Sequence, residues 1–246
     1  MSSPFVNALY RYLNGIRKVA AGLRPFSESV WPGVRNDLFV AHESIYRFCA
    51  QLVRDRDVLD AGCGTGYGTF ILANSGSRSA RGVDLDRRSI GFAKKRYRAP
   101  NLTFGVVDVE RLQFDDGSFD LIVASNVVEH LHDPKAFLQR MRKLLRAGGK
   151  AVIAAPPIYT SADVDVHAGI HYHRSNLPVS EWLILFRNTG FSVSGYLHNA
   201  RQGVAVDFKS HFPSRLSPED FVFTPTAIEG LLTQPSITAL FVVKAR

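Results

Sequence analysis

The stretch VLDAGCGTGYG at residues 58–68 decides the fold. An apolar strand ends at Asp60, and Gly62, Gly64 and Gly66 follow at alternate positions before a helix is expected to begin near residue 67. Glycine allows positive φ angles and the close approach of a ligand, and the first turn of a helix offers free N–H groups. The stretch is therefore typical of a loop that holds a nucleotide-like ligand at the carboxyl end of a strand.

Strands and helices alternate on both sides of this loop, which predicts a doubly wound α/β fold around a parallel sheet. Helices are expected at about 42–53, 67–75, 87–97, 134–146 and 179–188. Strands are expected at 57–60, 80–85, 102–107, 119–124, 151–155, 191–197 and 237–244. Residues 199–235 are rich in Pro, Ser, Thr and Phe without a clear period, and we expect an insertion there.

Three acidic residues end the first three expected strands. Asp84 lies 18 residues after Gly66, where a carboxylate can accept hydrogen bonds from both hydroxyls of a ribose. Asp108 could accept from an adenine amine, and Asp60 could meet an ammonium group or a loop N–H. The alternative is that all three are solvated acids around a structural turn.

Four motifs resemble those of class I S-adenosylmethionine-dependent methyltransferases. They are DAGCGTG at 60–66, VDLD at 83–86, VVDVERLQFDDGSFDLIVASNVVEHLHD at 106–133 and LLRAGGKAVIAAPP at 144–157. Dinucleotide dehydrogenases instead carry the spacing G-x-G-x-x-G. The resemblance implies a Rossmann-like, doubly wound, seven-stranded sheet with an antiparallel last strand and helices on both faces. It also implies that the insertion at about 199–235 shapes the acceptor pocket.

The resemblance also implies S-adenosylmethionine as the cofactor. By position, Asp60 and the glycines would hold its methionine moiety, Asp84 the ribose, and Asp108 with the backbone of Val109 the adenine, while Asn126 would lie beside the sulfonium. The expected cofactor-binding residues are Asp60, Gly62, Cys63, Gly64, Gly66, Tyr67, Asp84, Leu85, Asp108, Val109 and Asn126.

Glu129 and His130 follow the fourth expected strand and are the first candidates for catalysis. An alcohol acceptor must lose its proton, either to a general base or with the help of a metal ion. The pair resembles the Glu-His of the ubiquinone-pathway O-methyltransferases, in which an acid three residues earlier completes a metal site. Asn126 stands at that position here. His130 could therefore be the base or a structural residue, and Glu129 could bind a divalent metal such as Mg²⁺.

A second polar cluster follows the fifth expected strand, and its members are Asp163, Asp165, His167, His171 and His173. His173 precedes Gly190-Phe191 by about 17 residues, which is where many members of the resembling family carry a histidine. The cluster could contact the substrate, bind a metal or simply be solvated. We take His130, His171 and His173 as the candidate catalytic residues.

The N-terminal segment has the period of an amphipathic helix. Its apolar stripe comprises Phe5, Leu9, Leu13, Ile16, Ala20 and Leu23. We expect this helix to pack on the main domain or on a partner subunit, which would give a homodimer. The alternative is peripheral contact with an anionic membrane surface. Residues 1–41 are interpreted as a helical extension and linker, and residues 42–246 as the methyltransferase domain.

Composition excludes several classes of protein. The 246 residues carry 30 basic and 22 acidic side chains, a net charge of +8. No apolar run reaches the length of a membrane span, and no signal peptide is apparent. Two cysteines, Cys49 and Cys63, suit a reducing compartment such as the cytoplasm. Basic residues are scattered, and no Asn-Pro-Pro-Tyr-like tetrad follows the fourth strand, so we expect no nucleic-acid partner.

The expected acceptor is a sugar hydroxyl. The segment HESIYRFCAQLVRDRDVLDAGCGTGYG at 42–68 resembles methyltransferases of bacterial cell-surface glycan pathways. O-methylation of a sugar, oligosaccharide or polysaccharide precursor is therefore the leading hypothesis. A phenolic, quinone-precursor or other natural-product acceptor is the alternative, and nucleic-acid methylation is a weaker one. A purely regulatory module would need a damaged glycine motif, and the motif here is intact.

Overall fold

A computed structural model describes residues 4–23, 30–170 and 172–245, with side chains from residue 11 onward. The helices are α1 (Pro4–Ala20), α2 (Asp37–Ala50), α3 (Tyr67–Asn74), α4 (Arg87–Arg96), α5 (Pro134–Leu144), α6 (Ser161–Ala168), α7 (Val179–Asn188) and α8 (Ile228–Thr233). The strands are β1 (Asp57–Ala61), β2 (Ser79–Asp84), β3 (Leu102–Val106), β4 (Phe119–Ser125), β5 (Leu145–Ala155), β6 (Phe191–Ala200), β7 (Phe221–Thr226) and β8 (Thr238–Ala245). Short 3₁₀ turns cover Val109–Arg111, Val128–His130 and Pro218–Asp220.

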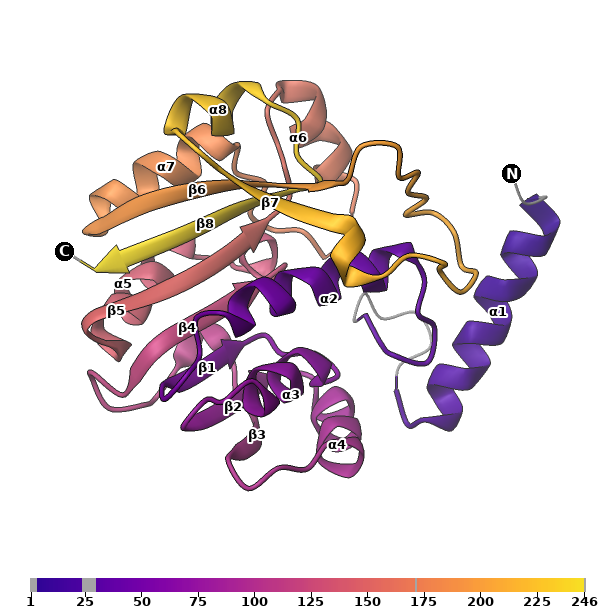
Figure 1. The fold of residues 1–246 in the computed structure, drawn as a ribbon, viewed down its shortest axis with the longest axis horizontal. Coiled ribbons are helices and arrows are strands. Elements are labelled where there is room, and N and C mark those ends of the chain that lie inside the picture. Colours follow the sequence, from indigo (N-terminus) through magenta and orange to yellow (C-terminus); the bar gives the residue numbers. More distant parts are fainter. Residues whose placement is uncertain (1–3, 24–29, 171, 246) are drawn as a thin grey trace.

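The strands form a single mixed sheet in the order β3-β2-β1-β4-β5-β8-β6-β7 (Figure 1). The first five strands in this order pair in parallel, whereas β8 is antiparallel to both β5 and β6. The doubly wound α/β fold with an antiparallel last strand is therefore confirmed. Strand β4 is buried along almost its whole length, as expected for a parallel strand covered on both faces.

The sheet has eight strands rather than the seven expected. The additional strand, β7, lies within the predicted insertion and pairs antiparallel with β6 at the edge of the sheet. Its sequence FVFTPT contains Pro225, which cannot donate a backbone hydrogen bond and is tolerated only at a sheet edge or bulge. Helices α6 and α8 were likewise not expected from the periodicity.

Helices cover both faces of the sheet and enclose one core on each (Figure 1). On one face Trp182 and Phe186 of α7 pack against Phe241 of β8 and are almost completely buried. On the other, Ile45 of α2 and Leu72 of α3 lie over the parallel strands. Burial of each such side chain contributes roughly 1.5–3 kcal/mol. The two cores fix the sheet, so that the carboxyl ends of its parallel strands form a stable edge.

Helix α2 begins five residues before the expected start at residue 42. The side chain of Asn36 accepts a hydrogen bond from the backbone N–H of Phe39, which is the N-cap arrangement that ends fraying at a helix start. The side-chain amide of Asn36 also donates to the carbonyl of Ser210, at 2.9 Å. The linker and the 201–220 segment are thus held together at the start of α2.

Helix α1 lies to one side of the sheet, next to the segment that follows β6 (Figure 1). The predicted helix is confirmed, but within it the described part of the apolar stripe does not pack on the main domain: Leu13 is 39% exposed and Ile16 is 50% exposed. Asn14 is buried instead and donates to the carbonyl of His211, whereas Leu23, the last member of the stripe, is buried just after the helix ends. Phe5 and Leu9 lie outside the described side chains. Across the described residues, no helix is both long and apolar enough to cross a membrane.

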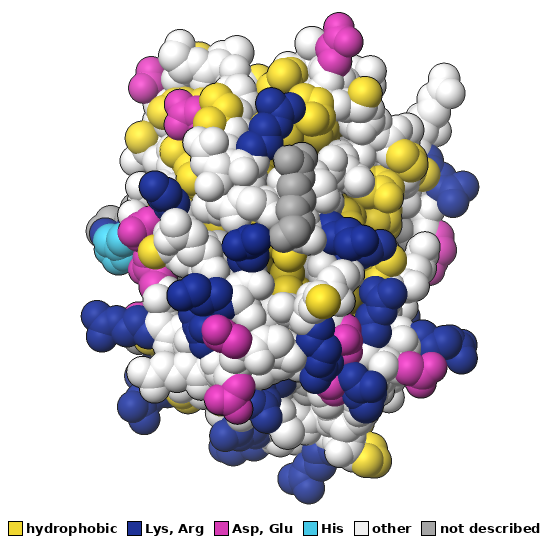
Figure 2. All heavy atoms as spheres, turned by 90° about the vertical axis from the view of Figure 1, so that its left-hand side faces the viewer, with side chains coloured by type: hydrophobic (Ala, Val, Ile, Leu, Met, Phe, Trp, Pro, Cys, Tyr) yellow, Lys and Arg dark blue, Asp and Glu magenta, His cyan; other side chains and the backbone are white. Residues whose placement is uncertain are grey.

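Charged residues gather at the amino ends of the parallel strands. Asp57 and Asp120 each pair with both Arg78 and Arg146, at 2.6–2.9 Å. The Arg78 guanidinium holds the pKa of Asp57 below its ordinary value. On this side of the molecule, Lys and Arg side chains are spread over the surface with Asp and Glu between them (Figure 2). Their scatter matches the expectation drawn from the sequence.

Candidate functional site

The glycine-rich loop between β1 and α3 combines positive φ angles with close packing. Gly62, Gly64 and Gly66 have φ angles of 80°, 51° and 83°. A Cβ at Gly62 would overlap the side chain of Val127, and a Cβ at Gly66 would lie 2.6 Å from that of Ala93. A Cβ at Gly64 would meet nothing within 4 Å. The outer two glycines therefore let the loop pack, and Gly64 borders open space where a ligand can lie.

Asp84 ties the tip of this loop to the end of β2. One carboxylate oxygen accepts from the backbone N–H of Gly64 and the other from that of Asp86, both at 2.8 Å. Burial raises the pKa of Asp84, and the two backbone donors partly offset this effect. The neighbouring Leu85 is 68% exposed at the same edge. The predicted ribose-binding carboxylate thus lies at the loop, held in a fixed position.

Asp60 lies beneath the loop and is completely buried. The hydroxyls of Thr69 and Tyr46 donate to its two oxygens, at 2.6 and 3.1 Å. Burial raises its pKa to about 7. The expected loop N–H or ammonium partner is replaced by two neutral hydroxyls from α3 and α2, so Asp60 joins both helices to β1.

Sequence reasoning missed Tyr46 and Thr69 as parts of this site. The sequence carries one indication, a further glycine at position 68. The structure explains it, because a Cβ there would overlap the Tyr46 ring. Tyr67 and Cys63, both predicted to bind the cofactor, are buried. The Tyr67 ring lies 5.5 Å from that of Tyr46. Both side chains therefore support the loop from within.

The predicted adenine-binding residues lie at the end of β3. Asp108 caps the turn Val109–Arg111 by accepting from the backbone N–H of Glu110 at 3.0 Å. Its side chain is 37% exposed. The half-buried Val109 packs against the core on the α5 and α7 face. The Asp108 carboxylate is thus partly accessible to a ligand, at the end of the strand that lies two places from β1 in the sheet.

Asn126 directs the chain after β4 toward the same edge. Its φ of 52° lies in the left-handed region, which asparagine adopts more readily than most residues. Its backbone N–H donates to the carbonyl of Ala154 on β5. The chain then turns through Val128–His130, which brings Glu129 and His130 to the carboxyl end of the sheet.

Glu129, His130 and His173 come together although 44 residues separate the first from the last. One potential ligand atom from each lies within 4.8 Å of the others. The backbone N–H groups of Arg174 and Ser175 donate to the carbonyl of Glu129, at 2.8 and 3.0 Å, and anchor the loop after α6. The structure therefore unites two of the predicted catalytic histidines with the predicted metal ligand.

The hydrogen bonds define which nitrogen of His130 can act. Its Nδ1 lies 3.1 Å from the carbonyl oxygen of Tyr172. A carbonyl can only accept, so in the neutral ring Nδ1 carries the hydrogen and Nε2 the lone pair. The rings of His130 and His173 meet edge to face, with centroids 5.2 Å apart.

His173 is flanked by a second histidine on its other side. Its Nδ1 lies 3.3 Å from that of His167, and the two rings stack. Burial, followed by the proximity of His130 and His167, lowers the pKa of His173 to about 4. It is therefore neutral at physiological pH. His171 lies outside the described residues. Asp163 completes the capping box of α6, in which its carboxylate accepts from the backbone N–H of the N-cap residue Thr160.

The donors in this cluster bear on the kind of metal it could hold. Two imidazoles and one carboxylate suit a first-row transition ion such as Zn²⁺. Mg²⁺ prefers oxygen ligands. Asn126 stands at the position of the third acid and supplies no carboxylate there. The residues thus fit a transition ion better than Mg²⁺, which the resemblance offered only as one option beside a metal-free base.

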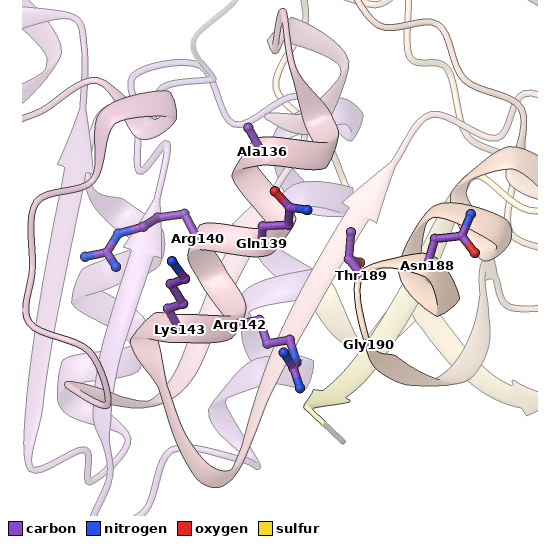
Figure 3. A pocket seen from close by; sticks show the side chains of 8 residues that line it. All are labelled: Ala136, Gln139, Arg140, Arg142, Lys143, Asn188, Thr189 and Gly190. Carbon is purple, nitrogen blue, oxygen red and sulfur yellow. The ribbon is translucent and has the colours of Figure 1, made fainter.

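A separate hollow lies between the second half of α5 and the end of α7 (Figure 3). It is open, and its side chains include Arg142, Lys143 and Asn188. Arg140 at its rim donates to the carbonyl of Leu112 and pairs with Asp116. The predicted site residues do not line it, and it is separate from the candidate site.

Comparisons with known proteins agree with this geometry. Residues 59–153 match a family described as a methyltransferase domain. A probable S-adenosylmethionine-dependent methyltransferase of Mycolicibacterium smegmatis is 31% identical over 178 residues, which is 70% of this chain and 68% of that protein. A phthiotriol/phenolphthiotriol dimycocerosates methyltransferase of Mycobacterium tuberculosis is 36% identical over 44% of this chain and 42% of its own length.

The fold agrees as well. The crystal structure of an S-adenosylmethionine-dependent methyltransferase from Mesorhizobium loti superposes with a TM-score of 0.62 at 18% identity, covering 85% of this chain and all of that one. A glycine loop tied to a strand-end acid, on this fold and with these relatives, leaves one conclusion. The chain belongs to the S-adenosylmethionine-dependent methyltransferases.

Proposed function

We propose that this methyltransferase transfers a methyl group to a hydroxyl of a sugar, oligosaccharide or polysaccharide precursor. The observation that carries the proposal is the pair of histidines, His130 and His173, beside Glu129 at the carboxyl edge of the sheet. An alcohol is a poor nucleophile until its proton is removed, so its methylation needs a base at this edge. A thiolate or a neutral amine acceptor would need no such group.

The cofactor would lie along the glycine loop. S-adenosylmethionine, when bound, supplies a methyl group already activated for transfer. Asp84 would accept from the ribose hydroxyls, Asp108 from the adenine amine, and the space beside Gly64 would take the methionine part. Asn126 would lie beside the sulfonium. The chain's own work is then to align the acceptor and to remove its proton.

We assign proton removal to Nε2 of His130. Nε2 would accept the hydroxyl proton while the acceptor oxygen bonds to the methyl carbon and the carbon–sulfur bond of the bound cofactor breaks to leave a neutral thioether. The Nδ1–H bond to the Tyr172 carbonyl would keep the ring oriented. His173 stays neutral because its pKa is lowered to about 4. A neutral neighbour lets His130 become positive without repulsion from a second imidazolium. If a divalent ion is bound, Glu129, His130 and His173 would hold it and it would acidify the hydroxyl instead.

Two segments would enclose the acceptor at this edge. The 201–220 segment is joined to the linker by hydrogen bonds from Asn36 to Ser210 and from the backbone of Asp207 to Asp37. Phe208 is 37% exposed on the 201–220 segment. Aromatic rings among polar groups suit the apolar face and the hydroxyls of a sugar.

A pair of histidine variants tests the assignment. His130→Ala should lower kcat by roughly 10²–10⁴-fold, the usual contribution of a general base, with little change in cofactor affinity by calorimetry. The matched control is His132→Ala, since His132 is 67% exposed and pairs with Glu110 outside the cluster. Wild-type turnover in His130→Ala would remove His130 as the base. Full activity in excess EDTA would exclude an essential divalent ion.

The acceptor class needs a direct assay. Radiolabelled methyl transfer to a panel of oligosaccharides, phenols and RNA should label a sugar hydroxyl. The relative that acts on phthiotriol and phenolphthiotriol dimycocerosates favours a natural-product acceptor as the second candidate. Exclusive labelling of a non-carbohydrate acceptor would decide for that alternative.

The remaining expectations concern organisation and location. We place the extension and linker at residues 1–41 and the methyltransferase domain at 42–246. Cys49 and Cys63 are both free thiols in the core, which supports a reducing, cytoplasmic location. A homodimer through the extension is tested by light scattering, together with the variants described next.

A further inference from the structure

The outer surface of α1 joins apolar and basic side chains. Tyr12 is 62% exposed, Ile16 50% and Val19 56%, and Leu13 adds to the same surface. Helix periodicity places residues 12, 16 and 19 on one side. An apolar surface of this kind on an isolated helix is typical of an interaction site.

The opposite side of α1 faces the main domain through polar contacts. Asn14 is 8% exposed and donates to the carbonyl of His211, and burial lowers the pKa of Lys18. The helix is therefore attached to the 201–220 segment by its polar side. This orientation is the reverse of the usual one, in which an amphipathic helix packs its apolar side against the core of the domain.

The charge on α1 distinguishes between two possible partners of its apolar surface, a second copy of this chain and an anionic membrane. Its sequence PFVNALYRYLNGIRKVA contains three basic residues and no acidic one. Arg11 and Arg17 are both exposed. Arg11 lies on the Asn14 side, where burial and then the charge of Arg11 lower the pKa of His211, and Arg17 lies between that side and the apolar one. Two copies of this surface brought face to face would oppose like charges. Anionic lipid headgroups would attract such basic residues, while the apolar side chains enter the acyl boundary.

We propose that α1 docks this protein on an anionic membrane surface. Docking itself does not depend on the proposed function, but its value for catalysis does. The 201–220 segment, to which α1 is attached, follows β6 at the carboxyl edge of the sheet, where the acceptor is proposed to bind. Docking would hold the proposed acceptor site close to the lipid headgroups. A glycan acceptor carried on a lipid would then meet the site without leaving the membrane.

Vesicle sedimentation tests the docking directly. The full chain should sediment with phosphatidylcholine vesicles containing 30% phosphatidylglycerol and not with pure phosphatidylcholine, and binding should weaken as salt rises. The double variant Ile16→Glu with Val19→Glu should lower the partition coefficient at least about tenfold, because it removes apolar contact and adds repulsion. Arg11→Glu with Arg17→Glu should abolish the preference for anionic vesicles.

The matched control uses exposed apolar residues elsewhere. Ile184 of α7 is 55% exposed and Leu232 of α8 is 41% exposed; their double substitution by Glu should leave sedimentation unchanged. Thermal melting confirms that each variant is folded. Equal binding by the wild type and the Ile16/Val19 variant overturns the proposal, as does failure of the wild type to bind. A wild-type dimer that this variant dissociates, without vesicle binding, would assign the surface to a second copy.

Cofactor affinity and methyl transfer to a soluble acceptor are measured on the same proteins without vesicles. Both should be unchanged in the α1 variants, since α1 is not part of the cofactor site. Loss of vesicle binding with intact methyl transfer in the α1 variants would show that α1 serves docking and not catalysis. Docking without sugar methylation would instead contradict the proposed function.

Discussion

The two ends of strand β1 carry aspartates in opposite electrostatic settings. Asp57, at the amino end, is paired with two arginines that lower its pKa. Asp60, three residues on, is completely buried and receives only neutral hydroxyls, and burial raises its pKa to about 7. One end of the strand neutralises its charge with opposite charges, and the other holds a carboxylate beside the cofactor loop without any cation. The first arrangement serves stability, and the second keeps a readily protonated carboxyl that joins two helices to the strand beside the cofactor loop.

The largest effect is expected for Asp84→Ala at the carboxyl edge. Loss of hydrogen bonds to a charged group costs about 1.5–3 kcal/mol, so S-adenosylmethionine affinity should fall roughly 10- to 150-fold. Calorimetry measures it. Asp116→Ala is the control, since Asp116 is 67% exposed and pairs only with Arg140 among the described contacts. An unchanged dissociation constant for Asp84→Ala would sink the ribose assignment.

A comparison of alanine variants at two glycines with positive φ, Gly62 and Gly76, separates the cost of backbone strain from the cost of a packing clash. Gly62→Ala should lower the free energy of unfolding by about 1–3 kcal/mol more than Gly76→Ala, because only the first Cβ meets a packed side chain, Val127. Urea denaturation gives both values. Equal losses would mean that the loop relaxes away from Val127 at little cost.

Asp57→Asn probes the ion pairs at the amino edge. The variant should lose about 1 kcal/mol of stability at pH 7, as for a partly exposed charge network. A lowered pKa stabilises the fold above the carboxyl's unfolded value and loses that effect as pH falls through the folded value. The difference from wild type should therefore shrink at pH 3, and also in high salt. A difference that is constant from pH 7 to pH 3 would contradict the ion-pair explanation.

Asp60→Asn should have the smallest effect, under about 1 kcal/mol at pH 6, where the wild-type carboxyl is largely protonated and similar in shape to the amide. A raised pKa means that the folded state binds the proton more tightly than the unfolded state does. Wild-type stability should therefore decline as pH rises from 4 through 7, and the variant should decline less. Urea denaturation at pH 6 and pH 8 compares them, and parallel curves would show that Asp60 is not the titrating group.

The sequence predicted the parallel half of the sheet well because its strands are short apolar runs between helices. Strand β7 escaped detection, since Pro225 and two threonines in FVFTPT resemble a loop and only pairing with β6 stabilises that segment as a strand. Period alone also predicted α1 as a helix. It could not predict which side of that helix would face the protein, because this depends on the Asn14–His211 contact, which joins residues 197 positions apart.

The candidate site was predictable to the extent that strand ends meet at one edge. Asp84 and Asp108 follow from their positions after β2 and β3. The hydroxyl partners of Asp60 do not, because Tyr46 and Thr69 come from two different helices. His173 approaches His130 through the backbone anchor on Glu129 and the contact between His130 and the Tyr172 carbonyl, which are long-range contacts that spacing along the chain does not encode.

Strand β8 has a consequence for biosynthesis. The β6–β7 hairpin is joined to the parallel strands through β8, which lies between β5 and β6. While residues 238–245 remain within the ribosome, the sheet is divided into two parts and Phe186 lacks its Phe241 partner. The nascent chain must therefore keep its apolar strand edges from pairing elsewhere until this segment emerges. Slow translation before residue 238 would lengthen that exposure, and a chaperone that shields β5 and β6 would shorten it.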